Sequence, residues 1–201
     1  MNFILIILVS YLMGSIPFSQ IFPRIIGKDA SKSGTKNVGA TNALVVAGPL
    51  IGVLALIGDI GKGYLAVYLA QKYQLHSWGV IFAGLAAVIG HDFSIFLKFK
   101  GGKGVATTGG ALMAFDLVFA MIMLLFLILL ITVTRYFILS SLIVLAAIPV
   151  LLFALGKSAE YITFAVMALI LALYTHREDI KRLISGKELN TSEALKRYLG
   201  S

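Results

Sequence analysis

Long runs of apolar residues are the feature that most restricts the fold of this chain. A helix rises about 1.5 Å per residue, so about 20 apolar residues are needed to cross roughly 30 Å of hydrocarbon. The sequence predicts an all-α, polytopic transmembrane helix bundle of about seven spans, some of them short or broken. The predicted spans are Phe3–Phe22, Pro49–Ala70, Trp78–Phe99, Val105–Phe115, Leu117–Thr134, Ile138–Leu155 and Tyr161–Tyr174.

The count of seven has an alternative. The segments Val105–Phe115 and Leu117–Thr134 meet at Asp116, a residue suited to capping the second helix. If the two form one bent pair, five or six spans remain. We see no internal repeat and no linker, and we expect residues 1–201 to form a single integral membrane domain.

Composition agrees with a membrane protein and removes several kinds of chemistry. Of the 201 residues, 59% are hydrophobic and 13% charged, which is too little polar surface to cover a water-soluble globule. The chain has no cysteine, so disulfides, thiolate metal sites and a cysteine nucleophile are excluded. The first apolar run has no basic segment before it and no cleavage pattern after it, and we expect it to be retained as a helix.

Basic residues predict the orientation of the bundle. Most of the 17 lysines and arginines follow the first span, precede the segment Val105–Phe115, or follow the last span. With seven spans and the N-terminus outside, these residues and Arg135 lie on the cytoplasmic face, as the positive-inside tendency requires. Topology and attraction to anionic lipids already explain much of this charge. The residues are Arg24, Lys28, Lys32, Lys36, Lys98, Lys100, Lys103, Arg177, Lys181, Arg182, Lys187, Lys196 and Arg197.

Two glycine-rich segments contain more glycine and polar residues than membrane topology explains. In Gly27–Asn42, GKDASKSGTKNVGATN, glycines permit positive φ and lysines add point charges, which favours anion binding. In Gly101–Gly110, GGKGVATTGG, free N–H groups at an expected helix start and the neighbouring Lys103 favour phosphate. The second segment does not follow the P-loop pattern. Its glycines are equally typical of close helix packing, so both interpretations stay open.

Ionisable residues inside predicted spans form a third group. Asp59 and Lys62 are three residues apart, near enough to form the ion pair that we favour. His91 and Asp92 shortly precede Phe99, about 10 Å inside the cytoplasmic boundary if the helix continues. Such charges cost about 2.5–3.5 kcal/mol each and usually face a protein interior or a wet cavity. A satisfied interior histidine and a catalytic one are equally consistent with His91.

Five short segments occur in an order that resembles one family along nearly the whole chain. They are GSIPF (Gly14–Phe18), GTKNVGATN (Gly34–Asn42), DIGKG (Asp59–Gly63), GHDFSIFLKFKGGKGVAT (Gly90–Thr107) and HREDIKRLISGKE (His176–Glu188). Each segment alone is weak. Together they make the chain similar to the bacterial acyl-phosphate:glycerol-3-phosphate acyltransferases, the PlsY family.

The resemblance implies a reaction of phospholipid synthesis. The 1-hydroxyl of glycerol 3-phosphate attacks the carbonyl of a fatty acyl phosphate, giving lysophosphatidic acid and inorganic phosphate. The implied partners are these two substrates and membrane lipids, in the bacterial inner membrane with the site on the cytoplasmic face. We expect no cofactor and no nucleic acid, because the basic residues belong to membrane loops. We expect no metal site either, since His76, His91 and His176 lie on separate segments.

The resemblance also implies roles for particular residues. One group binds phosphate or the glycerol hydroxyls: Thr35, Lys36, Asn37, Thr41 and Asn42. A second binds the acyl phosphate: Lys103 with Gly102 and Gly104, and with Lys100 in the same stretch. A third closes the site from the tail: His176, Arg177 and Asp179.

Direct attack without an acyl-enzyme is the expected mechanism. The chain has no G-x-S-x-G elbow and no H-x-x-x-x-D motif, so a covalent intermediate has no obvious nucleophile. Positioning and charge stabilisation then supply most of the acceleration. The resemblance implies that the substrate's own phosphate takes the proton. His91 and His176 are the alternative bases.

Several positions depart from the family pattern. Thr35 and Lys36 replace the usual Ser and Gly, and Val45 stands where a basic residue is usual, a contact that Lys36 would have to supply. Asp179 replaces Asn and needs a cation partner, for which Arg177 is the candidate. Ser94 replaces Pro. These departures leave two alternatives open: a diverged, non-catalytic lipid-binding paralogue, and a small membrane transporter, whose site would lie near mid-membrane.

Overall fold

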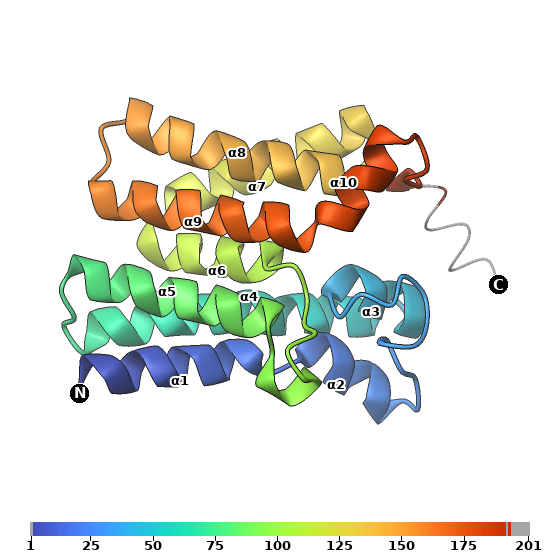
Figure 1. The fold of residues 1–201 in the computed structure, drawn as a ribbon, viewed down its shortest axis with the longest axis horizontal. Coiled ribbons are helices and arrows are strands. Elements are labelled where there is room, and N and C mark those ends of the chain that lie inside the picture. Colours follow the sequence, from blue (N-terminus) through green and yellow to red (C-terminus); the bar gives the residue numbers. More distant parts are fainter. Residues whose placement is uncertain (1, 192, 194–201) are drawn as a thin grey trace.

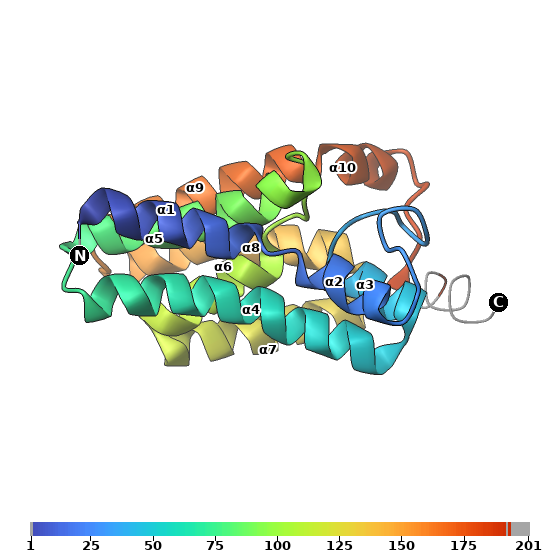
Figure 2. The ribbon, with the colours of Figure 1, turned by 90° about the horizontal axis from the view of Figure 1, so that it is seen from below.

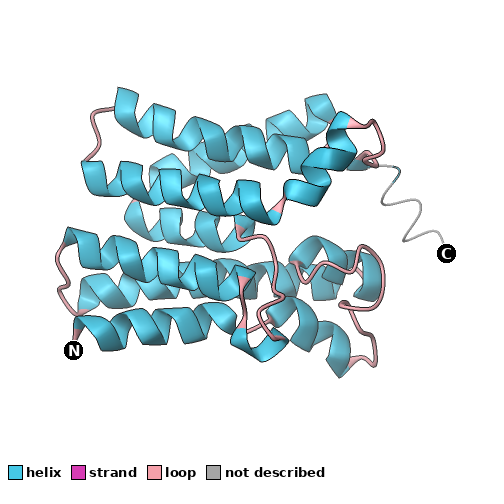
Figure 3. Ribbon diagram, viewed as in Figure 1, coloured by secondary structure: helices cyan, strands magenta, loops and turns pink. Residues whose placement is uncertain are grey.

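The computed structural model describes residues 2–191 and 193, and every regular element in that part of the chain is a helix (Figure 3). The longer helices run along one long axis of the molecule (Figure 1, Figure 2). In chain order the elements are α1 (Phe3–Ser15), α2 (Phe18–Ile25), α3 (Ala40–Ala47), α4 (Pro49–Lys72), α5 (Ser77–Asp92), the 3₁₀ helix η1 (Ile95–Leu97), α6 (Val105–Phe115), α7 (Leu117–Thr134), α8 (Phe137–Ala154), α9 (Ala159–Thr175) and α10 (Arg177–Ile184).

Helix α6 lies between two groups of helices. On one side α1, α4 and α5 pack together, and on the other α7, α8 and α9 do so (Figure 1). α6 approaches α4 closely because both helices carry glycine at the contact: a Cβ at Gly63 would meet Thr107 O, and a Cβ at Gly110 would meet Ile60 O. Small residues commonly let helices associate in membranes in this way. The packing interpretation of the glycine-rich segment therefore holds for Gly110.

The apolar helices confirm an integral membrane architecture. In the described part of the chain, four helices are long and apolar enough to cross a membrane, or up to six if the bent pairs α1–α2 and α9–α10 each count as one span. α6 is a shorter apolar helix. Each predicted segment therefore contains a helix, whereas the count of seven spans and the side on which each terminus lies stay predictions.

Two predicted spans are interrupted as helices. The first run is not one helix to Phe22, because α1 and α2 meet at Ile16–Pro17 with a bend of 40°. Proline has no N–H to donate and holds the residue before it in extended backbone. The predicted span Trp78–Phe99 corresponds to a candidate span of residues Ser77–Leu97, in which the regular α-helix ends at Asp92 and η1 follows. The depth of about 10 Å derived for His91 from helical rise therefore does not hold.

The connections between helices contain one further element and one confirmed cap. α3 begins inside the segment predicted as a loop, and its eight residues are too few for a span. Asp116 caps α7 as predicted: its Oδ1 accepts a hydrogen bond from Phe119 N at 3.0 Å, while Oδ2 lies 2.9 Å from Lys157 Nζ. α6 and α7 are separate helices that meet at this residue.

Candidate active site

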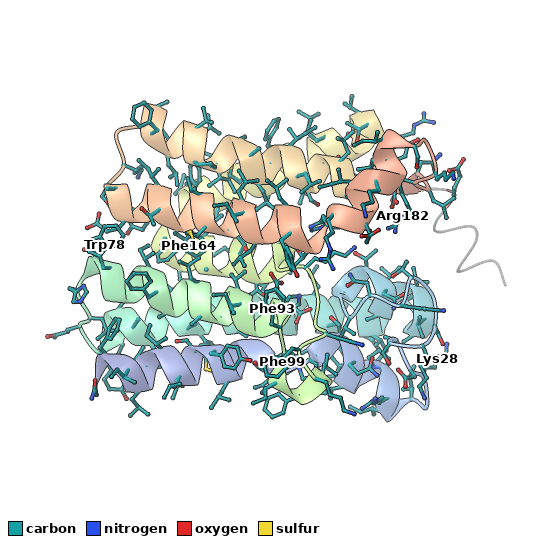
Figure 4. The ribbon with its side chains drawn as sticks, in the orientation of Figure 1. Lys28, Trp78, Phe93, Phe99, Phe164 and Arg182 are labelled. Atoms are coloured by element: carbon teal, nitrogen blue, oxygen red, sulfur yellow. The ribbon has the colours of Figure 1, made fainter. Side chains whose placement is uncertain are left out.

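Three polar segments come together at one end of the bundle: Gly27–Asn42, here called the first loop, the turn Gly101–Gly104, and the segment His176–Glu188 that contains α10, here called the tail. In both ribbon views α2, α3 and α10 lie at the same end, and Lys28 and Arg182 lie at the end opposite Trp78 (Figure 4). The segment that joins them is the turn Gly101–Gly104, here called the glycine turn. A Cβ at Gly102 would lie 2.7 Å from Val38 O in the first loop, and Lys103 forms an ion pair with Asp179 of α10. Two predicted members of the basic group, Lys196 and Arg197, lie outside the described residues.

The glycine turn connects the end of α5 to the start of α6. Gly101 N–H donates to Asp92 O at 3.0 Å and Gly102 N–H donates to His91 O at 2.9 Å. The turn thus satisfies carbonyl groups that the last turn of α5 cannot pair internally. Gly104 follows with a φ of +73°, a backbone conformation that favours glycine.

Free backbone amides follow directly after these two bonds. Within the described residues, the amides of residues 103–107 have no hydrogen-bond acceptor. A run of free donors at a helix start, where the helix dipole is positive, is an anion-binding arrangement. The Gly102 amide is already bonded, so we assign Gly102 to shaping the turn and keep Gly104 among the candidate ligands.

The tail holds Lys103 in place. Its ammonium pairs with Asp179 Oδ2, and the other oxygen of the same carboxylate pairs with Arg182. The predicted partner of Asp179 was Arg177, and this prediction is wrong. Arg177 is exposed, stacks over the Tyr174 ring and donates to Tyr174 O at 2.9 Å. Asp179 is therefore neutralised by two other cations, one of which is the candidate phosphate ligand.

Asn42 organises the first loop from within. Its Oδ1 accepts from Thr35 N at 2.8 Å, and its Nδ2 donates to Ala30 O at 2.6 Å and to Ser33 O at 3.2 Å. The side chain is 1% exposed and both its amide hydrogens are used. We therefore assign Asn42 to shaping the loop instead of binding phosphate.

The other candidates from the first loop are more open. Thr35, Lys36 and Thr41 are exposed, and Asn37 is half-buried. Val45, at the position where a basic residue is usual, is buried in α3 and supplies no charge. Lys36 stays the candidate for the missing contact, and its φ of 60° is an uncommon conformation for a lysine.

Asp29 fixes the beginning of the same loop. Its Oδ1 accepts hydrogen bonds from Ser31 Oγ at 2.6 Å and from Gln20 Nε2 at 2.6 Å. These bonds stabilise the ionised carboxylate, the bond from Ser31 more than the bond from Gln20. They lower the pKa of Asp29 from its usual 3.8 to about 2. The loop is therefore tied to α2 by a charged side chain.

His91 belongs to a buried polar cluster, defined as Asp59, Lys62, His91 and Asp92. Lys62 Nζ lies 3.0 Å from Asp59 Oδ1, which confirms the predicted ion pair, and His91 Nδ1 lies 3.5 Å from the same oxygen. His91 is 7% exposed, and a Cβ on Gly102 would meet its Nε2. Both ring nitrogens are thus enclosed, and the structure supports the interior histidine over the catalytic one.

His176 lies near Lys103 and Asp179 and is turned into the protein. Its Nδ1 is 2.8 Å from Ala172 O. Because a carbonyl oxygen only accepts, Nδ1 carries a proton, and in the neutral ring Nε2 is left as the base. Lys100, by contrast, is exposed.

Sequence patterns did not indicate two contributors to the site. The sequence indicates Arg182 only as one of the basic residues of the cytoplasmic face, although its spacing of three from Asp179 on a helix is typical of an ion pair. Val38 approaches Gly102 through its backbone carbonyl, and a backbone contact leaves no signal in the residue pattern. Among the described residues, no three His, Asp or Glu side chains are grouped as metal ligands.

Fold and site together define an integral membrane protein with a phosphate-type anion arrangement at one end of an apolar helix bundle. The family model described as glycerol-3-phosphate acyltransferase matches residues 4–186. A glycerol-3-phosphate acyltransferase of Geotalea daltonii is 38% identical over 185 residues, covering 92% of this chain and 95% of the relative. Another, of Thermosipho melanesiensis, is 40% identical over 198 residues, covering 95% and 94%. This chain therefore belongs to the glycerol-3-phosphate acyltransferase family of enzymes.

Solved structures agree with this membership. A crystal structure of PlsY (YgiH), an integral membrane glycerol 3-phosphate acyltransferase in its glycerol 3-phosphate form, matches with a TM-score of 0.89 and 34% identity, covering 94% of both chains. The lysophosphatidic acid form of that protein matches with a TM-score of 0.88 and 35% identity, covering 96% of this chain and 98% of the other. The similarity thus extends over nearly the whole fold.

Proposed function

We propose that this chain transfers a fatty acyl group from an acyl phosphate to the 1-hydroxyl of glycerol 3-phosphate in one direct step. The hydroxyl oxygen forms a bond to the acyl carbonyl carbon, and the bond from that carbon to the phosphate oxygen breaks. The hydroxyl proton leaves with the phosphate. The products are lysophosphatidic acid and inorganic phosphate.

The run of free amides at residues 103–107 is the observation that carries this proposal. These donors and the positive end of α6 favour the phosphate of the acyl donor and the charge that grows on it as it departs. Lys103 adds an ammonium at the same place. To reach the phosphate, it exchanges the Asp179 carboxylate for a phosphate oxygen.

Direct transfer is favoured because the sequence has no G-x-S-x-G elbow that would present an activated nucleophile for an acyl-enzyme. The chain has no cysteine. Two buried serines, Ser19 and Ser94, already use their hydroxyls: Ser19 Oγ donates to Asp59 at 2.7 Å and Ser94 Oγ donates to Ser15 O at 2.5 Å. Phosphate is a good leaving group, so alignment of the two substrates supplies much of the acceleration. The phosphate itself takes the proton in this proposal, and His176 Nε2 is the alternative acceptor.

The second substrate is assigned to the first loop. Thr35, Lys36, Asn37 and Thr41 offer hydroxyl, amide and ammonium groups that suit the phosphate and hydroxyls of glycerol 3-phosphate. The fatty chain of the donor matches the apolar outer surfaces of the helices. Arg177 and Lys100 are both exposed, and their charges suit the headgroups of anionic lipids.

The proposal extends to the placement of the protein. It is a multi-pass protein of the bacterial inner membrane, in one domain, with the N-terminus outside and the polar end at the cytoplasm. The gathering of basic residues at the end that carries Lys28 and Arg182 supports this orientation.

Phosphate release by the purified protein tests the reaction. We expect release to require both acyl phosphate and glycerol 3-phosphate, with lysophosphatidic acid formed in equal amount. Acyl-CoA serves as the comparison donor, and acylation from acyl-CoA alone would overturn the choice of donor. No turnover with either donor would favour the non-catalytic lipid-binding alternative.

A lysine variant tests the proposed phosphate site, here called the cradle, which consists of the free amides of residues 103–107 and the Lys103 ammonium. In Lys103→Ala, we expect kcat/KM for acyl phosphate to fall about 100-fold, as for the loss of one donor at a developing anion. Lys32→Ala is the matched control, because Lys32 is an exposed lysine at the same end and outside the proposed cradle. Normal kcat and KM for both substrates in Lys103→Ala would show that the cradle lies elsewhere.

A further inference from the structure

The buried polar cluster ties together elements that are far apart in the chain. Asp59, on α4, accepts a hydrogen bond from Ser19 Oγ of α2 at 2.7 Å and lies 3.5 Å from His91 of α5. Lys62 pairs with Asp59 and also donates to Ile16 O at 3.1 Å, where α1 breaks. One carboxylate therefore connects the α1–α2 break, α4 and the end of α5.

The glycine turn rests directly on this cluster. His91 and Asp92 are the last two residues of α5, and their carbonyls accept the N–H groups of Gly102 and Gly101. Their side chains lie under the same turn. A Cβ on Gly102 would meet His91 Nε2, and one on Gly104 would lie 2.9 Å from Asp92 Oδ1. A shift of His91 would therefore move the backbone from which the free amides begin.

Stability alone is a poor explanation of the cluster. Asp59 is 1% exposed, and a buried ion pair is often no more stabilising than apolar residues of the same volume. Asp59 Oδ1 makes charge contacts without an aligned hydrogen bond, and both oxygens of Asp92 lack a hydrogen-bond partner in the described structure. Such an arrangement is better suited to fixing a geometry than to adding stability.

We infer that Asp59 is a positioning residue for acyl transfer: through His91, it holds the glycine turn and so aligns the free amides of residues 103–107. The inference rests on the proposed function of those amides. Asp59 and His91 do not touch substrate in this account. They act through the two backbone hydrogen bonds of the turn.

Hydrogen exchange tests the positioning without turnover. In His91→Leu, which removes the Asp59 contact without burying a new polar group, we expect the amides of Gly101 and Gly102 to exchange about tenfold faster. Asp59→Asn should act in the same direction, and His91→Leu keeps the test valid if that variant does not fold. Asp116→Asn is the control, because Asp116 pairs with a lysine elsewhere in the fold, and exchange at the turn should not change. Unchanged exchange at Gly101 and Gly102 in both cluster variants would overturn the inference.

Kinetics test whether the positioning serves the reaction. In His91→Leu we expect kcat/KM for acyl phosphate to fall about tenfold, while KM for glycerol 3-phosphate stays within about twofold. His91→Asn keeps an N–H close to the Nδ1 position and should restore most of the loss. Equal losses for both substrates, or no rescue by His91→Asn, would show a general structural role instead. If the unaltered protein does not use acyl phosphate, the proposed function fails, whereas the exchange result still decides the positioning.

Discussion

At the scale of single residues, Asp179 controls how available Lys103 is to a phosphate. Lys103 is the lysine to which we assign the leaving phosphate. Its buried carboxylate lies between Lys103 and Arg182 and pairs with both. A carboxylate there competes with a phosphate for the Lys103 ammonium, since the same donors serve either anion. The ion pair therefore sets part of the free energy that a phosphate substrate has to supply on binding.

Replacing this carboxylate should strengthen substrate binding. In Asp179→Asn we expect KM for acyl phosphate to fall about threefold to tenfold, because a neutral amide holds the Lys103 ammonium less strongly. Steady-state kinetics measure the change. Glu178→Gln is the matched control: Glu178 is the neighbouring residue, is exposed, and pairs with Lys181 at 3.0 Å. A raised KM in Asp179→Asn would mean that the carboxylate positions Lys103 for the phosphate.

At the scale of helices, the sequence predicts the long apolar elements well and the short polar ones poorly. The predicted segment Leu117–Thr134 coincides with α7, because its apolar run is bounded by Asp116 and Arg135. By contrast, α5 ends at Asp92 because the amides of Gly101 and Gly102 return to cap its carbonyls. That cap is a contact between separated residues, so local periodicity does not reveal it.

The same reason explains which site residues were recognisable. Lys103 and the glycine turn stand out because charge and glycine are unusual between apolar runs. The partners are set by tertiary packing. Asp179 pairs with Arg182 instead of Arg177 because Arg177 turns outward onto Tyr174. Asn42 is a residue type that commonly binds phosphate, so the sequence predicts a ligand. Its three hydrogen bonds within the loop show instead that it anchors the loop.

The first loop should depend on the charge of Asp29. Because the pKa of Asp29 is lowered from 3.8 to about 2 on folding, its ionised form stabilises the loop above about pH 4, and this contribution is lost as the pH falls toward 2. We expect Asp29→Asn to speed amide exchange across residues 30–35 near neutral pH. The difference from the unaltered protein should shrink as the pH falls through about 2 and vanish below that value. A difference that persists unchanged at low pH would mean that Asp29 acts by shape and not by charge.

The junction of α6 and α7 should depend on its cap more than on its ion pair. In Asp116→Ala we expect a loss of about 1 kcal/mol in unfolding free energy, the usual cost of removing an N-cap. Asp116→Asn keeps a good capping side chain and loses only a half-exposed ion pair with Lys157, so its loss should be smaller. Thermal unfolding in detergent measures both. Equal losses in the two variants would assign the stabilisation to the ion pair.

At the scale of the whole molecule, basic residues gather at one end of the bundle. Lys28 and Arg182 lie at one end and Trp78 at the other (Figure 4). The chain carries a formal net charge of +8, and both proposed substrates carry phosphate, so one electrostatic field attracts both to the same end. Exposed aromatic residues such as Trp78 are typical of a membrane–water interface, which suits the opposite end.

The orientation of this polarity in the membrane can be measured with single cysteines, because the chain has none of its own. Gln74→Cys places a thiol in the exposed connection between α4 and α5, and Ser185→Cys places one just after α10, at the polar end. We expect a membrane-impermeant maleimide to label Gln74→Cys in spheroplasts with an intact inner membrane. Ser185→Cys should react only after that membrane is opened, because the positive-inside tendency places the basic end in the cytoplasm. The reverse labelling pattern would place the whole proposed site, including the glycine turn and Lys103, on the outer face.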